Sequence, residues 1–81
     1  MRKNEIKGKI RRLIMNHFNI KGKNIPNFLI SDNVENWDSV GHISLITEIE
    51  KEFHIKLNEE YSYTLLDEKK ILEKIMEIKN L

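Results

Sequence analysis

The chain has 81 residues, a formal net charge of +1 and no cysteine. A chain this short forms one domain with one small core, because it buries only about 60% of the surface that its unfolded form exposes. Disulfides and thiolate metal sites are excluded. No apolar run approaches the ~20 residues of a membrane span, and the charged start of the chain does not resemble a signal peptide, so we expect a soluble, cytoplasmic protein.

Charge is strongly segregated along the sequence. Residues 1–30 carry eight Lys or Arg and one Glu, a net charge of +7, whereas residues 31–68 carry ten acidic residues and two Lys, a net charge of −8. The remaining residues, 69–81, carry a net charge of +2. This asymmetry predicts two surfaces with different partners.

The first predicted helix covers residues 3–18. Its apolar stripe recurs at three- and four-residue spacing and contains Ile6, Ile10, Leu13 and Ile14. Its other face is basic, which is compatible with a nucleic-acid or membrane surface or with a plain solvated face. We favour the solvated face, because no aromatic residues interleave with the basic ones and none anchors the helix to a membrane.

A connection of about twenty residues, 19–38, follows this helix. Breakers stand at Gly22 and Pro26, and we expect Pro26 to open a short helical turn through Phe28 and Leu29. Because a structureless loop of this length is uncommon in a compact domain, apolar anchors must pin it across the helices. The candidate anchors are Ile25, Phe28, Leu29, Ile30, Val34 and Trp37.

The second predicted helix starts near Ser39 and ends near Phe53. Either Asp38 or Ser39 can cap its first turn with a side-chain oxygen. The apolar positions expected to face inward are Ile43, Ile46, Ile49 and Phe53, with Val40 and Leu45 on or beside the same stripe. The hydroxyl of Ser39 therefore lies at a helix N-terminus, where the free N–H groups and the macrodipole favour an anion.

The last third of the chain predicts a turn and one more helix. His54 can end the second helix in a left-handed conformation, and Asn58 caps a short turn over residues 59–61. A helix over residues 67–79 follows, with Ile71, Leu72, Ile75 and Ile78 inward and Met76 at the edge. We expect this helix to pack with Ile10 and Leu13 of the first helix, giving an all-α, small four-helix bundle.

The segment Asp38-Ser39-Val40, followed by an acidic amphipathic helix that ends Glu52-Phe53-His54-Ile55, resembles the attachment region of the acyl carrier proteins. The similarity covers about residues 29–57, and the flanks match in helical layout and loop length. It implies a bundle of acyl-carrier type, with a long loop between helices 1 and 2 and a short third helix. It also implies that Ser39 is the attachment site of a 4′-phosphopantetheine arm, which comes from coenzyme A and is held through a phosphodiester.

This resemblance implies a non-catalytic carrier of acyl or aminoacyl thioester intermediates in a lipid or specialised biosynthetic pathway. Its partners are then a phosphopantetheinyl transferase and the enzymes that load and use the acyl group, and we expect a monomer without membrane insertion, nucleic acid or metal. Partner recognition is assigned to Asp38, Val40, Glu48 and Glu52, since the acidic side chains can steer a basic partner. The chain departs from the family at Asn36 and His54, where glycine is usual, at Val40 in place of leucine, and in its basic first helix.

Other interpretations of the same residues stay open at this point. Asp38, Ser39 and His42 could form a hydrolytic triad, but no Gly-x-Ser-x-Gly turn is present, and Ser39 could be an ordinary cap. We expect His42 to be half-exposed, or to lie near a phosphodiester on Ser39, and Trp37 to anchor the loop. The alternative function is a small helical protein- or nucleic-acid-interaction module that uses the basic first helix.

Overall fold

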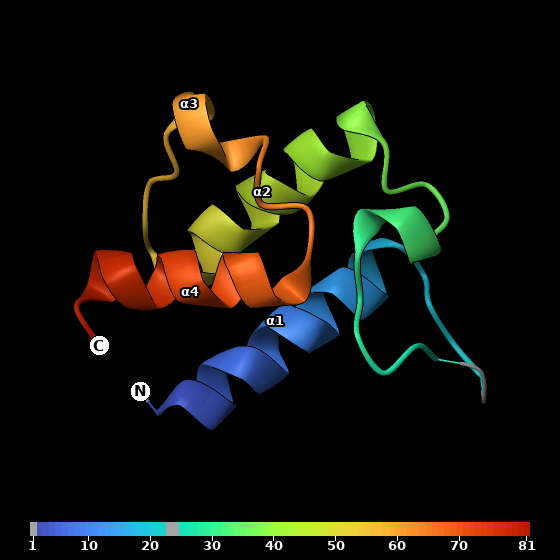
Figure 1. Ribbon diagram of the computed structural model, residues 1–81, viewed down its shortest axis with the longest axis horizontal. Helices are drawn as coiled ribbons and strands as arrows, with labels where there is room; N and C mark the ends of the chain where they lie inside the picture. The colour runs from blue at the N-terminus through green and yellow to red at the C-terminus, as the bar shows by residue number, and fades with distance from the viewer. Residues whose placement is uncertain (1, 23–24) are drawn as a thin grey trace.

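The computed structural model describes residues 2–22 and 25–81. In this part of the chain it contains α1 (Lys3–His17), a 3₁₀ turn η1 (Ser31–Asn33), α2 (Ser39–Phe53), α3 (Glu59–Ser62) and α4 (Glu68–Lys79). Helix α1 packs against both α2 and α4, and α3 lies at the upper edge of the molecule (Figure 1). The predicted all-α bundle with a long first loop and a short third helix is confirmed. None of the described helices is both long enough and apolar enough to cross a membrane.

The helices begin and end at residues that the sequence marks as caps. Asp38 Oδ1 accepts from the backbone N–H of Gly41 at 2.9 Å, which assigns the cap of α2 to Asp38 rather than Ser39. Asn58 caps α3 and Asp67 caps α4 in the same way. Helix α2 ends at His54 with φ 53° and ψ 48°, the left-handed conformation predicted for it.

The core lies between α1, α2 and α4 and is sealed by the first loop. Its helical members are Ile6, Ile10, Ile14, Leu45, Ile46, Ile49, Phe53, Ile71, Leu72 and Ile75. Three loop residues, Leu29, Val34 and Trp37, are also buried, so the predicted role of Trp37 as a packing anchor is confirmed. Leu13, predicted to face inward, is only partly buried against this core.

The predicted inward face of α2 was wrong at one position. Ile43 is 68% exposed, and the inward position that the apolar pattern gave it is taken by His42, which is 7% exposed. The buried stripe of α2 is His42, Leu45, Ile46, Ile49 and Phe53, and Ile43 lies about 100° around the helix from His42. His42 can occupy the inward position because both of its ring nitrogens are hydrogen-bonded there. Ile78, in the last turn of α4, is also more exposed than predicted, at 38%.

The short turn in the first loop was predicted too early in the chain. Pro26 and Asn27 have bend geometry or none, and the helical turn is η1 at Ser31–Asn33. The carbonyls of Pro26 and Asn27 accept from the guanidinium of Arg11, which ties this part of the loop to α1. The loop is instead tied to the start of α4, where the backbone of Leu29 accepts from Glu68 N–H and Ile30 forms an isolated antiparallel bridge with Asp67.

Candidate functional site

Ser39 is the first residue of α2, and its side chain is exposed. Asp38 caps the helix immediately before it, so the hydroxyl of Ser39 is not used as the cap. The first backbone N–H groups of an α-helix have no partner within the helix, and they create a weakly positive end next to this hydroxyl. The hydroxyl is therefore accessible from solvent at the N-terminus of α2.

The turn that presents Ser39 depends on two residues with special backbone requirements. Asn36 has φ 71°, the left-handed conformation that glycine adopts most readily and that asparagine tolerates better than most other residues. The backbone before the cap therefore takes a positive φ without a glycine at this position. Gly41, in the first turn of α2, lets the Asn36 carbonyl approach the helix, because a Cβ there would overlap that oxygen and lie 2.9 Å from Phe18 Cε1.

Replacing Gly41 by alanine is therefore expected to lower the free energy of unfolding by about 1–3 kcal/mol, since a backbone carbonyl cannot move aside cheaply. Gly8→Ala is the matched control. Gly8 lies in α1 with nothing within 4 Å of the position that a methyl group would take, so alanine should stabilise the protein by up to about 1 kcal/mol. Urea denaturation of both variants checks the pair, and equal effects would contradict the close approach at Gly41.

His42 is buried and forms two hydrogen bonds that the sequence did not indicate. Its Nδ1 accepts from the indole N–H of Trp37 at 3.0 Å, and its Nε2 lies 2.8 Å from the carbonyl oxygen of Ser62. The prediction of a half-exposed His42 was wrong. Because both ring nitrogens are occupied, this side chain is not free to act as a base for Ser39 or to contact a phosphate on it, which removes the triad interpretation.

A stack of rings holds Trp37 in place. Its ring lies 5.3 Å from that of Phe18 at an interplanar angle of 20°, and 6.2 Å from that of His42 at 19°. Phe18 follows the end of α1, so the stack connects α1, the loop before α2 and the first turn of α2. The turn beside Ser39 is therefore packed from three directions.

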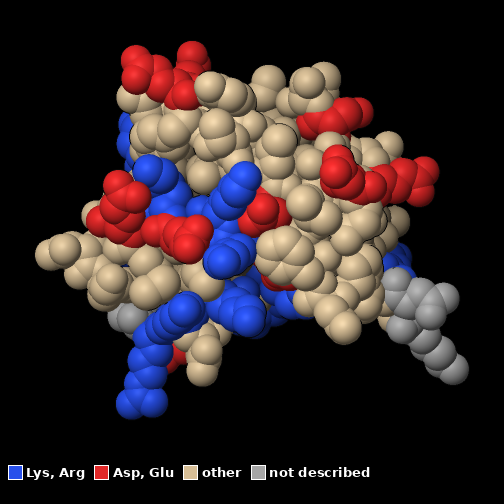
Figure 2. Space-filling view, in the orientation of Figure 1, with Lys and Arg blue, Asp and Glu red and all other residues tan. Residues whose placement is uncertain are grey.

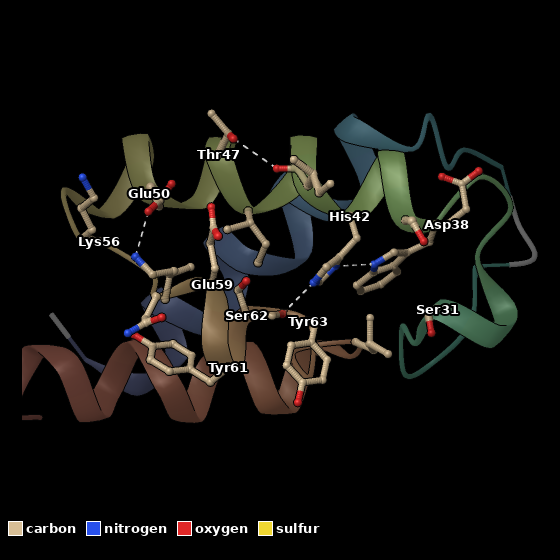
Figure 3. Close-up of a pocket in the computed structure, with 17 residues that line it drawn as sticks. Ser31, Asp38, His42, Thr47, Glu50, Lys56, Glu59, Tyr61, Ser62 and Tyr63 are labelled. Atoms are coloured by element: carbon tan, nitrogen blue, oxygen red, sulfur yellow. Dashed lines mark hydrogen bonds between the residues drawn. The ribbon is translucent and has the colours of Figure 1, made fainter.

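A cleft of about 1120 Å³ starts at Ser39 and runs between α2 and the segment that contains α3. Its apolar lining comes from Trp37, Ile43, Ile46, Leu57 and Leu66. Figure 3 shows Asp38 at one end of the cleft and Glu50 and Lys56 at the other, with Ser62 and Tyr63 on the opposite wall from α2. The sequence reasoning missed Ser62, Tyr63 and the whole cleft, because the α3 wall is brought to α2 only by folding.

The residues predicted to recognise partners lie on different surfaces. Asp38 lines the cleft, while Val40 is 76% exposed beside Ser39 and outside the lining. Glu48 and Glu52 are exposed on α2, but Glu52 borders a small hollow that it shares with Lys9 and Arg12 of α1. The α1 cations reduce the field of Glu52, which leaves Glu48 as the less screened of the two.

Glu50, which the sequence places near these acidic residues, has a structural contact. Its Oε2 accepts from the backbone N–H of Leu57 at 2.8 Å. Figure 2 shows that Lys and Arg gather over α1 and α4, with some acidic side chains among them on the left, while other acidic side chains lie along the upper edge near α3 and on the right. The segregation seen in the sequence therefore persists in part on this face of the folded protein.

No protein-family model, curated protein or solved structure matches the chain.

Proposed function

We propose that this protein is a carrier of acyl-carrier type, modified on Ser39 with a 4′-phosphopantetheine arm. The observation that carries the proposal is an exposed serine at the start of α2 that opens directly onto a cleft of about 1120 Å³. The resemblance of residues 29–57 to the carrier attachment region supports the same assignment. A role of Ser39 as an ordinary N-cap explains neither its position at the cleft nor the sequence resemblance, because the N-cap of α2 is Asp38.

The residues around Ser39 fit a phosphodiester. The first turn of α2 offers unpaired N–H groups to an anion, and Asp38 directs its carboxylate to Gly41 N–H as a cap. Exposed apolar side chains flank the site at Val40 and Ile43, which gives a partner enzyme a surface to bind. The cleft then provides room for the arm or its cargo beside the helix.

The modification makes one bond and breaks one bond. Ser39 Oγ attacks the phosphorus that bears the pantetheine of coenzyme A, the pyrophosphate P–O bond breaks, and adenosine 3′,5′-bisphosphate leaves. The transferase must supply the base that takes the hydroxyl proton, because His42 is engaged with Trp37 and Ser62. When bound, the arm supplies a thiol that holds the cargo as a thioester, and its flexible length raises the local concentration of cargo at a docked enzyme.

A phosphopantetheinyl transferase with coenzyme A and magnesium is expected to add one arm to the wild type and none to Ser39→Ala. Intact-mass analysis measures the gain. Ser44→Ala is the matched control, since Ser44 is another exposed serine of α2, and this variant should be modified as the wild type is. An unmodified wild type with several transferases, or an arm that persists in Ser39→Ala, would contradict the proposal.

Glu48→Lys is expected to slow this modification, mainly through the association rate, and raising the salt concentration should slow the wild type. Lys3→Glu and Lys7→Glu are the controls, because both side chains are exposed on the basic helix α1. Arg11 is unsuitable as a control, because it is bound to Glu68 and to the first loop. Transferase rates at two salt concentrations check the ranking; a larger effect at Lys3 and Lys7 would place docking on α1.

The basic surface over α1 and α4 favours a second candidate, an interaction module for an anionic partner such as nucleic acid (Figure 2). Phe18 is not available as a stacking platform there, because its ring packs on Trp37. A salt-titrated binding assay with a DNA or RNA oligonucleotide separates the two functions. Phosphate contacts would make the affinity fall steeply with salt, whereas a carrier of the proposed kind should bind neither.

A further inference from the structure

The wall of the cleft opposite α2 consists of residues 57–65 and is anchored in the core mainly at its two ends. Leu57 and Leu65 are buried at 6% and 4% exposure, whereas α3 between them is four residues long and contributes no buried residue. Two side chains of α2 reach across to this wall. Glu50 accepts from Leu57 N–H at 2.8 Å, at the end far from Ser39, and His42 bonds the carbonyl of Ser62 at 2.8 Å, one turn from Ser39.

The two partners of His42 determine its tautomer. An indole N–H can only donate, so Nδ1 of His42 must be the unprotonated acceptor of the bond from Trp37. The ring proton of a neutral His42 is then on Nε2, which donates to the carbonyl oxygen of Ser62. One imidazole thus joins the turn that presents Ser39 to the C-terminal end of α3, over a separation of 20 residues in the sequence.

We propose that His42 is a positioning residue that latches the α3 wall to α2 and so sets the width of the cleft next to Ser39. The proposal rests on the proposed function, because the occupant of the cleft is an acyl chain on the Ser39 arm. Release of the bond to Ser62 lets residues 58–64 move outward between their leucine anchors, while the bond to Trp37 keeps the Ser39 turn in place. Tyr61, whose ring lies 4.2 Å from the ammonium of Lys74, limits this movement on the α4 side.

Two substitutions separate the two bonds of His42. The Oδ1 of asparagine can occupy the position of Nδ1, so His42→Asn keeps an acceptor for Trp37 and loses the donor to Ser62. The Nε2 of glutamine can occupy the position of the histidine Nε2, so His42→Gln keeps that donor and loses the ring acceptor. Both replacements are uncharged amides, so the two variants differ in which of the two hydrogen bonds of His42 they keep.

Hydrogen exchange of the unmodified proteins tests the latch. The backbone amides of Ser62, Thr64 and Leu65 belong to the wall and bond to carbonyls within it. Their exchange is expected to rise about 2–10-fold in His42→Asn and to stay near the wild-type rate in His42→Gln, while the Trp37 indole N–H should show the reverse order. Equal changes in both variants, or no change in either, would overturn the proposal.

The wild type provides a measurement that does not depend on any variant folding. Nitrogen-15 spectra of neutral His42 should show a protonated Nε2 and an unprotonated Nδ1, and the other tautomer would overturn the latch. Transfer of a hexanoyl arm from hexanoyl coenzyme A should raise the exchange of the Ser62 and Leu65 amides above that with the arm alone. Unchanged exchange would overturn the outward movement of residues 58–64. Failure of every transferase to modify Ser39 would instead overturn the carrier function, and the exchange and tautomer results on the unmodified proteins would then decide the latch.

Discussion

Replacing Ile49 by alanine is expected to lower the free energy of unfolding by about 2–5 kcal/mol. Ile49 is fully buried in the core, and alanine would leave a cavity that rigid neighbouring helices fill only in part. Small domains have about 5–15 kcal/mol of stability in total, so this single change removes a large share. Urea or thermal denaturation followed by circular dichroism measures the loss.

The matched control for this experiment is Ile43→Ala. The two isoleucines lie in the same helix and lose the same atoms, but Ile43 is 68% exposed, so its truncation should change stability by no more than about 0.5 kcal/mol. The comparison also tests whether Ile43 faces solvent, as in the structure, or the core, as the apolar pattern predicted. Similar losses at both positions would mean that Ile43 faces the core after all.

Replacing Glu68 by alanine is expected to cost about 2–4 kcal/mol. Glu68 is 5% exposed, and its Oε1 accepts from Leu29 N–H at 2.7 Å and from Arg11 Nη1 at 2.8 Å. Its removal leaves a buried N–H without an acceptor and takes away one tie between the first loop and the start of α4. The backbone bond from residue 68 to the Leu29 carbonyl and the Ile30–Asp67 bridge remain. The loss of the Arg11 partner adds less, because that side chain is 29% exposed and water can solvate it.

Two further variants isolate the cause of this loss. Glu68→Gln keeps an oxygen for Leu29 N–H and should cost less stability than Glu68→Ala. Its NH₂ group would take the place of Oε2, a buried atom without a hydrogen-bond partner in the described structure, so some loss remains. Glu77→Ala removes an exposed acid, 72% exposed and paired with Lys74, and should have an effect below about 1 kcal/mol. The denaturation midpoints of Glu68→Ala, Glu68→Gln and Glu77→Ala rank their losses of stability. A loss for Glu77→Ala as large as that for Glu68→Ala would contradict the structural role of the buried Glu68 carboxylate.

Much of the candidate site follows from local signals. Asp38 before Ser39 predicts a helix start at a serine, because a capping carboxylate satisfies first-turn N–H groups wherever the helix packs. The tolerance of asparagine and histidine for left-handed backbone explains why His54 was predicted correctly and why Asn36 could have been. An isolated glycine inside a helical pattern, as at Gly41, is the one signal that could have indicated the close approach before Ser39.

The sequence by itself determined the number, order and approximate ends of the helices, since caps and the 3.6-residue period act over a few neighbouring positions. Only the tertiary structure decided that His42 faces inward instead of Ile43, because its burial depends on Trp37 and on Ser62, 20 residues away. It likewise decided that Arg11 and Glu68 hold the first loop, and that α3 closes one side of a cleft at Ser39. Burial of a polar side chain is favourable only when distant partners meet it, and periodicity carries no information about those partners.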